Sequence, residues 1–220
     1  MDQTSVAPNQ LEPAKQIVDR MAAMYAACQS YMDEGEVNTI FIQNKGRRIV
    51  TKPFCTAFVR PSNFRFEFRD RHSEEEEWQR YMVWTDGISV KTWWTVRPGV
   101  EIKPSLSRAI AGATGVSSGS AHNIPKLLMP DEITGSALSS VVEWKLLREE
   151  DVGSITAYVI EGRRHGDRLT TFWVDKRTLL ILKIFSQREH ADFETETTTT
   201  YRPQINAPIP PERLTFDVPE

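Results

Sequence analysis

The sequence is poor in the residues that build disulfide frameworks and metal sites. Its 220 residues include only two cysteines, Cys28 and Cys55, and four histidines. None of them stands at the HxxH or CxxC spacing of zinc ligands, so we expect no metal site and no cofactor. The sequence leaves open whether Cys28 pairs with Cys55, and two separately buried thiols are the simpler expectation.

Long apolar runs and an excess of basic charge are also missing. No run approaches the roughly 18 consecutive apolar residues of a transmembrane helix. With 27 basic and 30 acidic residues the net charge is −3, and no basic run stands near the aromatic residues, so we expect no nucleic-acid partner. A hydrophobic content of 40% is enough for one core. We therefore expect a disordered arm at 1–10 and a single domain over 11–220.

The first regular pattern is that of an amphipathic helix. Pro13 stands where a helix can begin, because its missing N–H has no partner to lose in the first turn. Apolar residues then recur at intervals of three and four: Ile17, Met21, Met24, Cys28 and Tyr31. Gly35 is a natural C-terminal stop. The spacing predicts a helix over 11–34.

Beyond Gly35 the apolar period becomes two, which is typical of β-strands. Phe64, Phe66 and Phe68 alternate with charged residues, so their three rings must share one face of a strand. The dipeptide Asp86-Gly87 predicts a hairpin with a type I′ turn. The patterns place strands at 37–43, 47–60, 63–71, 79–85 and 88–96, and later at 141–148, 154–163, 168–175, 179–189, 193–201 and 214–218.

The segment 104–140 is different, because Ser, Ala and Gly dominate its first half. We expect one or two short helices of low local stability there, acting as a mobile lid over 105–129. Strands joined by short turns form antiparallel sheets, and large sheets curl as their twist accumulates. The fold class we predict is mainly β: a curled antiparallel half-barrel of about ten to eleven strands, with the N-terminal helix and the short lid helices covering its concave face.

One catalytic motif occurs in this segment. Residues 115–119 fit G-x-S-x-G, the nucleophile elbow of serine hydrolases, with Ser117 as the nucleophile. That elbow requires a strand directly before it and a helix after it. The preceding residues 110–114 are typical of a helix or a loop, so we expect no enzyme activity. A serine hydrolase that uses Ser117 stays a remote alternative.

Large apolar side chains predict a cavity on the concave face. More of them are expected to point inward than one helix can cover, and a curled sheet with such a face can enclose an apolar ligand. The alternative is ordinary core packing. The residues we expect to line the cavity are Phe64, Phe66, Phe68, Met82, Trp84, Trp94, Leu127 and Leu128.

Short motifs follow one another along nearly the whole chain: Phe58-Val59-Arg60-Pro61, Phe64-Arg65-Phe66-Glu67, Trp84-Thr85-Asp86-Gly87, Phe172-Trp173-Val174-Asp175 and Ile209-Pro210. Their order resembles the periplasmic lipoprotein carriers of the LolA/LolB type and their uncharacterised relatives. The resemblance implies a non-enzymatic protein that shields an acyl chain of a lipid or lipoprotein. It also implies that Arg60, in the Arg-Pro motif, latches the lid by hydrogen bonds to helix carbonyls.

The same resemblance implies a monomer in the bacterial periplasm, with the export signal removed. Residues 1–5 contain neither the basic nor the apolar region of a signal peptide, so a cytoplasmic location is the alternative. Besides an acyl chain, an envelope protein is an expected partner. An envelope sensor or interaction domain of the same fold is therefore the second functional hypothesis.

Overall fold

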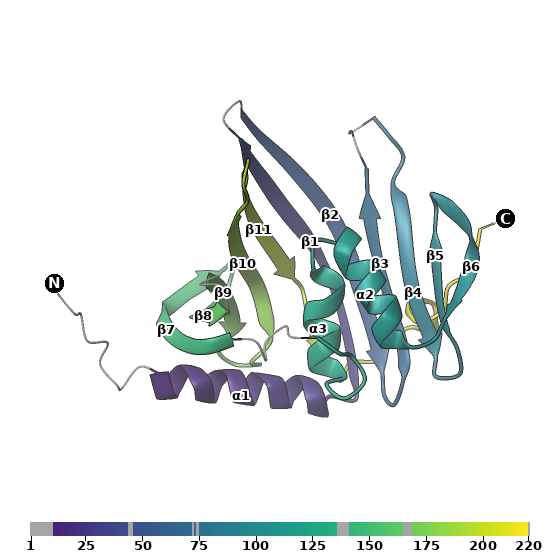
Figure 1. The fold of residues 1–220 in the computed structure, drawn as a ribbon. Helices are drawn as coiled ribbons and strands as arrows, with labels where there is room; N and C mark the ends of the chain where they lie inside the picture. Colours follow the sequence, from purple (N-terminus) through teal and green to yellow (C-terminus); the bar gives the residue numbers. More distant parts are fainter. Residues whose placement is uncertain are drawn as a thin grey trace.

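The structure is a computed structural model, and it describes residues 11–43, 46–71, 73, 75–135, 141–164 and 169–219. The arm expected at 1–10 lies outside these residues. In the described part, twelve strands form one antiparallel sheet in the order β6-β5-β4-β3-β2-β1-β11-β10-β9-β8-β7, with β12 paired to β1. The sheet ends at β6 and β7 without closing (Figure 1). The predicted fold class, a mainly β open half-barrel with helices, is confirmed.

The helices of the described chain are α1 (Leu11–Ala27), α2 (Leu106–Val116), α3 (Ser120–Leu128) and a short 3₁₀ helix η1 (Pro211–Arg213). The first half of the sheet contains β1 (Ser30–Gln43), β2 (Gly46–Val59), β3 (Asn63–Asp70), β4 (Gln79–Asp86), β5 (Val90–Trp94) and β6 (Arg97–Lys103). The second half contains β7 (Val141–Val152), β8 (Ile155–Arg164), β9 (Leu169–Asp175), β10 (Ile181–Glu189), β11 (Glu194–Tyr201) and β12 (Gln204–Ile205). No helix among the described residues is both long enough and apolar enough to span a bilayer.

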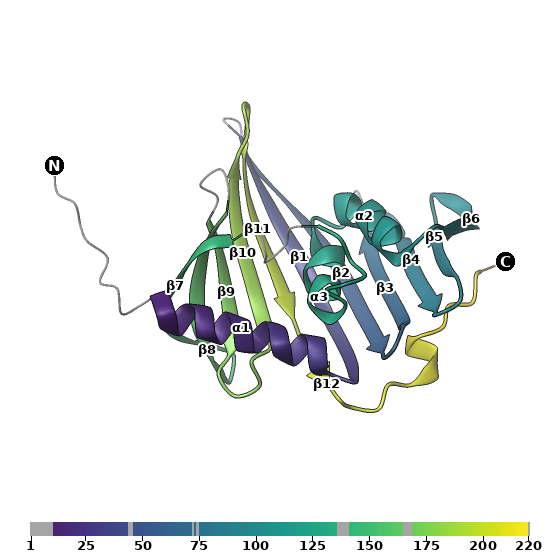
Figure 2. The ribbon, with the colours of Figure 1, turned by 60° about the horizontal axis from the view of Figure 1, so that its bottom comes forward.

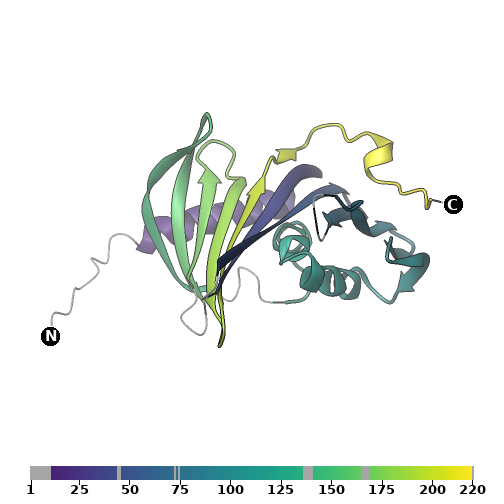
Figure 3. The ribbon, with the colours of Figure 1, turned by 90° about the horizontal axis from the view of Figure 1, so that it is seen from above.

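The three α-helices lie on the concave face of the sheet. Helix α1 crosses the β7–β10 half, whereas α3 and α2 lie over the β1–β6 half, with α2 against β4–β6 (Figure 2). The last part of the chain, residues 206–219, runs over the opposite, convex face, and we name it the C-terminal strap (Figure 3). The sheet therefore has a helix-covered apolar side and a second side that is crossed by an extended segment.

The N-terminal helix is shorter than the predicted span of 11–34. It ends at Ala27, and the chain enters β1 at Ser30. Tyr31 is buried as predicted, but from a strand that pairs with β2, β11 and β12. The apolar spacing of three and four residues continues by chance from α1 to Tyr31. The helix nevertheless ends at Ala27, because the residues from Ser30 onward pair with other strands of the sheet.

Three further expectations about strands and turns are wrong. The strand expected at 88–96 is shorter, Val90–Trp94, and Pro98 and Gly99 lie inside the next strand, the edge strand β6, where the outer backbone groups need no partner in the sheet. Residues 214–218 form no strand, because this part of the strap follows η1 and packs through side chains. The hairpin at Asp86-Gly87 is present, but of these two central residues only Gly87 has positive φ, so the turn is not type I′.

Gly35 does not cap a helix but provides space in β1. An ideal Cβ at this position would lie 2.2 Å from the carbonyl oxygen of Thr200 and 2.5 Å from the ring of Phe54. We expect Gly35→Ala to lower the free energy of unfolding by about 2–3 kcal/mol, because the neighbouring strand must shift. Urea denaturation measures this loss. Gly115→Ala is the matched control, since nothing lies within 4 Å of its Cβ and alanine favours the helix by up to about 1 kcal/mol; equal losses in both variants would contradict the explanation.

Candidate functional site

Aromatic rings of β2 and β3 fill the concave face beneath α2 and α3. Phe64, Phe66 and Phe68 are buried in one core cluster with residues of these helices. The rings of Phe54 and Phe66 stack with centroids 6.1 Å apart, and Phe68 stacks on Tyr81 at 5.5 Å. The three phenylalanines of β3 thus lie on one face. That they contact a ligand stays a prediction, because in this conformation helix side chains cover them.

Met82 and Trp84 lie on the opposite face of the sheet. The register of β4 places Met82 beside Glu67 and Trp84 beside Arg65, and both pack with Trp93 and Phe216 under the strap. The expectation that they share a cavity with the phenylalanines of β3 is wrong. Both alternating sets of β4 side chains are apolar, so the sequence does not indicate which set points inward.

Trp94 lies on the concave side at the edge of the sheet. Its ring centroid is 5.9 Å from that of Tyr81, and it lines a pocket of about 240 Å³ with Gly112 and Val116 of α2. Tyr81, which stacks on Phe68, also lines this pocket, so the pocket adjoins the phenylalanine cluster. Trp94 therefore remains a candidate ligand contact at the far end of the concave face.

A larger apolar groove, of about 510 Å³, opens between α1, α3 and the start of β7. Its lining is apolar except for Asp19 and Lys126: Val18, Asp19, Ala22, Ala23, Ala26, Lys126, Leu127, Pro130, Val141 and Trp144. Of the two predicted α3 residues, Leu127 lines this groove, whereas Leu128 is fully buried in the core. Its volume lies in the range of small-molecule sites, roughly 300–1,000 Å³.

Arg60 joins the C-terminal ends of α1 and α3. Its Nε donates to the carbonyl oxygen of Cys28 at 2.8 Å, and its Nη2 donates to that of Leu128 at 2.8 Å. Nη2 also contacts the carbonyl oxygens of Tyr25 and Ala26. Carbonyls at helix ends have no partner within the helix, so one guanidinium satisfies several of them. The structure thus contains the contacts expected of Arg60; that they latch a moving lid stays a prediction.

Sequence reasoning missed a buried carboxyl on the concave side of β1. Asp33 accepts hydrogen bonds from the hydroxyl of Tyr31 at 2.7 Å and from the backbone N–H of Thr56 at 2.9 Å. Burial raises the pKa of Asp33 from 3.8 to about 6, although these hydrogen bonds act in the opposite direction. The alternation of Tyr31, Asp33, Gly35 and Val37 was the signal that could have placed Asp33 inward.

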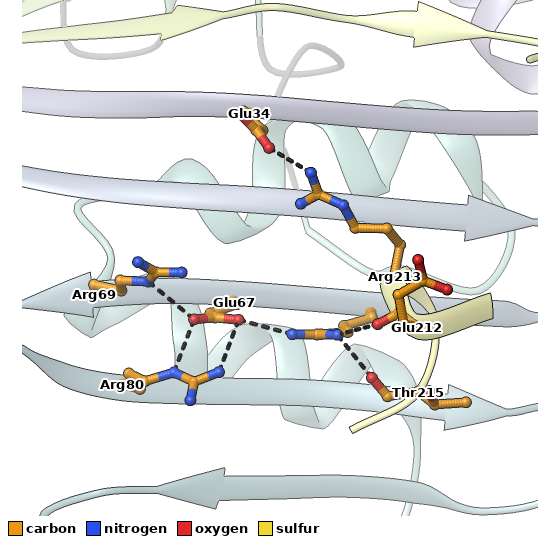
Figure 4. Close-up of polar contacts among 8 residues, drawn as sticks. Glu34, Glu67, Arg69, Arg80, Glu212, Arg213 and Thr215 are labelled. Atoms are coloured by element: carbon orange, nitrogen blue, oxygen red, sulfur yellow. Dashed lines mark hydrogen bonds and ion pairs between the residues drawn. The ribbon is translucent and has the colours of Figure 1, made fainter. Parts of the chain in front are cut away.

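A second missed feature is an arginine cluster around Glu67 on the convex face (Figure 4). The Glu67 carboxylate, in a residue only 2% exposed, accepts from Arg65 at 2.9 Å, Arg69 at 3.0 Å and Arg80 at 2.9 and 3.3 Å. Arg65 also donates to the strap carbonyls of Glu212 and Thr215, both at 2.7 Å. The cluster therefore ties the strap to β3.

Ser117 does not have the surroundings of a nucleophile. It caps the C-terminus of α2, is fully buried, and its Oγ accepts from the backbone N–H of Ala121 at 3.2 Å. A helix precedes it where the hydrolase elbow needs a strand. Cys28 and Cys55 are free thiols. Within the described ranges, no three His, Cys, Asp or Glu side chains come close enough to hold a metal ion.

The fold and these surfaces define an open antiparallel half-barrel with helices on its concave face. No protein-family model matches the sequence, and no curated protein does. Solved structures share the fold. LprF from Mycobacterium bovis is 9% identical over 96% of this chain and 98% of its own, with a TM-score of 0.54. MucB is 16% identical with a TM-score of 0.51, and the match covers 94% of this chain but 63% of the MucB chain.

A LolA superfamily protein from Nitrosomonas europaea also matches, at 12% identity over 92% of this chain and 97% of its own, with a TM-score of 0.35. At these identities the comparisons show fold alone. At that level, this chain shares the fold of LprF and MucB.

Proposed function

We propose that residues 11–220 act as one monomeric domain of the bacterial cell envelope that binds an acyl chain of a lipid or lipoprotein without covalent chemistry. The observation that carries this proposal is the apolar groove of about 510 Å³ between α1 and α3. Three alanines of α1 leave the groove open, and Leu127 and Trp144 supply apolar walls. Asp19 and Lys126 at its sides are suited to contact with the polar end of such a molecule.

The energetics support reversible binding. Each buried methylene of an acyl chain contributes about 0.8 kcal/mol, so a dozen contribute roughly 10 kcal/mol before costs. Lost translational and rotational freedom opposes association by about 4 kcal/mol or more. The balance corresponds to binding that is tight enough to remove a chain from water and weak enough to release it.

Binding of a fluorescent fatty acid tests the proposal. We expect Ala22→Phe, which fills the groove, to weaken binding at least tenfold. Ala111→Phe is the matched control, because it adds the same ring at an exposed position on α2, and it should bind as the wild type does. Native mass spectrometry of protein purified from cells should show bound lipid. Absence of binding by the wild type, or equal binding by both variants, would refute the proposal.

We further propose that α3 moves to enclose the acyl chain in the groove, and that Arg60 is its latch. We expect Arg60→Leu to speed amide hydrogen exchange in α3 and at the end of α1, because helix-end carbonyls lose their donor. Global stability should fall by only about 1–2 kcal/mol. Arg60→Lys keeps the positive charge, but an ammonium group cannot donate to all of these carbonyls at once. Its amide exchange rates should therefore lie between those of wild type and Arg60→Leu. Unchanged exchange over 105–129 in both variants would mean that Arg60 is no latch.

The alternative function, an envelope protein-interaction module, is favoured by a different surface. Ile102 of the edge strand β6 is 75% exposed, and Ile88, in the turn before β5, is 92% exposed. Val100 of β6 and Val96 are exposed as well. MucB, whose fold this chain shares, forms a complex with MucA(peri). Protein binding at this edge should be lost in Ile102→Asp and kept in Ala22→Phe. An acyl-chain binder should show the reverse.

A further inference from the structure

Two adjoining pockets lie on the convex face, between β1–β3 and the C-terminal part of the chain. Their volumes are about 230 and 280 Å³. They share four lining residues, Glu34, Cys55, Arg202 and Arg213, of which Arg213 belongs to η1 in the strap. The acyl groove proposed above lies among the helices on the other face, so these pockets form a separate site.

Positive charge dominates the lining of these pockets. Four arginines, Arg65, Arg69, Arg202 and Arg213, line them together with three carboxyl groups, those of Asp33, Glu34 and Glu67. Glu67 is already shared among three guanidinium groups. Glu34 accepts from Arg213 at 2.6 Å and lies 3.8 Å from Arg202 (Figure 4 shows the Arg213 contact). The carboxylates present therefore do not balance the arginines, although the chain as a whole is acidic.

One buried donor at this site has no acceptor. Arg65 uses Nη1 for two strap carbonyls and Nη2 for Glu67. Its Nε is buried and has no hydrogen-bond partner among the residues that the structure describes. Buried polar atoms are nearly always paired, and leaving a charged donor unpaired is costly. An acceptor from outside the chain would complete this arrangement.

We propose that these pockets bind a small oxyanion, the phosphate or carboxylate group of a small molecule. Guanidinium groups present fixed pairs of donors that match both groups. Arg202 can close on such a ligand, because its side chain is 77% exposed and only weakly held by Glu34. The pocket volumes fall below the roughly 300 Å³ at which drug-sized sites begin, which fits a small anion and not a lipid. The bound anion would bridge the strap and β3 through Arg213 and Arg65.

Nuclear magnetic resonance of arginine Nε–H groups tests this inference directly. The Arg65 signal is assigned by its loss in Arg65→Lys. Inorganic phosphate and succinate are titrated separately, each against sodium chloride of equal ionic strength. We expect a saturable shift of the Arg65 Nε–H signal with at least one of the two anions. Saturation by phosphate alone identifies a phosphoryl group as the ligand chemistry, and saturation by succinate alone identifies a carboxylate.

The control variants separate a site from general charge attraction. Arg202→Gln should weaken the apparent affinity at least tenfold, and Arg202→Lys should weaken it less. Arg148→Gln removes an exposed arginine on the distant strand β7 and should leave the affinity unchanged. The inference is overturned if neither anion shifts the signal more than sodium chloride does, or if Arg202→Gln and Arg148→Gln bind equally.

Discussion

Replacing Glu67 by glutamine is expected to lower the free energy of unfolding by about 3 kcal/mol, because removal of one partner from a buried ion pair leaves uncompensated charge. Three guanidinium groups converge on this carboxylate at 2.9–3.3 Å. Burial alone would raise the pKa of Glu67, but the hydrogen bonds and charge of Arg80, with the bonds from Arg65 and Arg69, hold it below 4.5. The carboxylate is therefore ionised in the folded protein across the neutral range.

For a chain of this size such a loss lowers Tm by roughly 6–12 °C, which thermal unfolding measures. Glu149→Gln is the matched control, because Glu149 forms an exposed pair with Lys176 at 2.7 Å, and exposed pairs contribute about 1 kcal/mol at most. The explanation fails if the two variants lose equal stability. Because Arg65 also holds the strap, Glu67→Gln should in addition speed amide exchange over residues 206–216.

Asp33 is expected to destabilise the folded protein as the pH rises. Burial raises its pKa to about 6 in the folded protein, from an ordinary value of 3.8. Between these pH values the unfolded chain loses its proton while the folded chain keeps it, so stability falls as the pH rises. At roughly 1.4 kcal/mol per pKa unit, and with the unfolded group already more than half ionised at pH 4, Asp33→Asn should gain about 2 kcal/mol relative to wild type between pH 4 and pH 7.

Urea denaturation at pH 4 and pH 7 measures the free energy of unfolding of variant and wild type. The contribution of the other carboxylates is the same in both proteins and cancels in the difference. Glu34→Gln provides a control of opposite sign at the adjacent residue. The hydrogen bond from Arg213 lowers the pKa of Glu34. The stabilising contribution of the Glu34 carboxylate is therefore lost as the pH falls. Glu34→Gln should lower the free energy of unfolding, relative to wild type, more at pH 7 than at pH 4. If the difference in free energy of unfolding between Asp33→Asn and wild type is the same at both pH values, the pKa of Asp33 is not raised in the folded protein.

Much of the fold follows from local alternation. The pattern of Phe64, Phe66 and Phe68 correctly predicts a strand with one apolar face. The composition of 104–140 predicts one or two short helices, and the structure has two there. Arg60 was found through a short motif whose contacts with helix carbonyls the structure contains. Each of these predictions needs only neighbours along the chain or a recognisable motif.

The parts that sequence reasoning missed depend on which segments meet in space. Tyr31 has the spacing of a helix residue, but pairing of β1 with β2 and β11 places it in a strand. Met82 and Trp84 alternate as any strand residues do, and only the strap and Phe216 make their face a buried one. Asp33 and Glu67 are ordinary charged residues in the sequence.

The sequence by itself thus determined the order of strands and helices, the open half-barrel class and the position of Arg60. Periodicity records how each segment divides its own side chains between two faces. Only the tertiary structure decided where α1 ends, which face of β4 points inward, and that Glu67 and Asp33 are buried. Those outcomes depend on partners far away in the chain, such as the strap at 206–219 over β3, and no local pattern encodes the energy of such contacts.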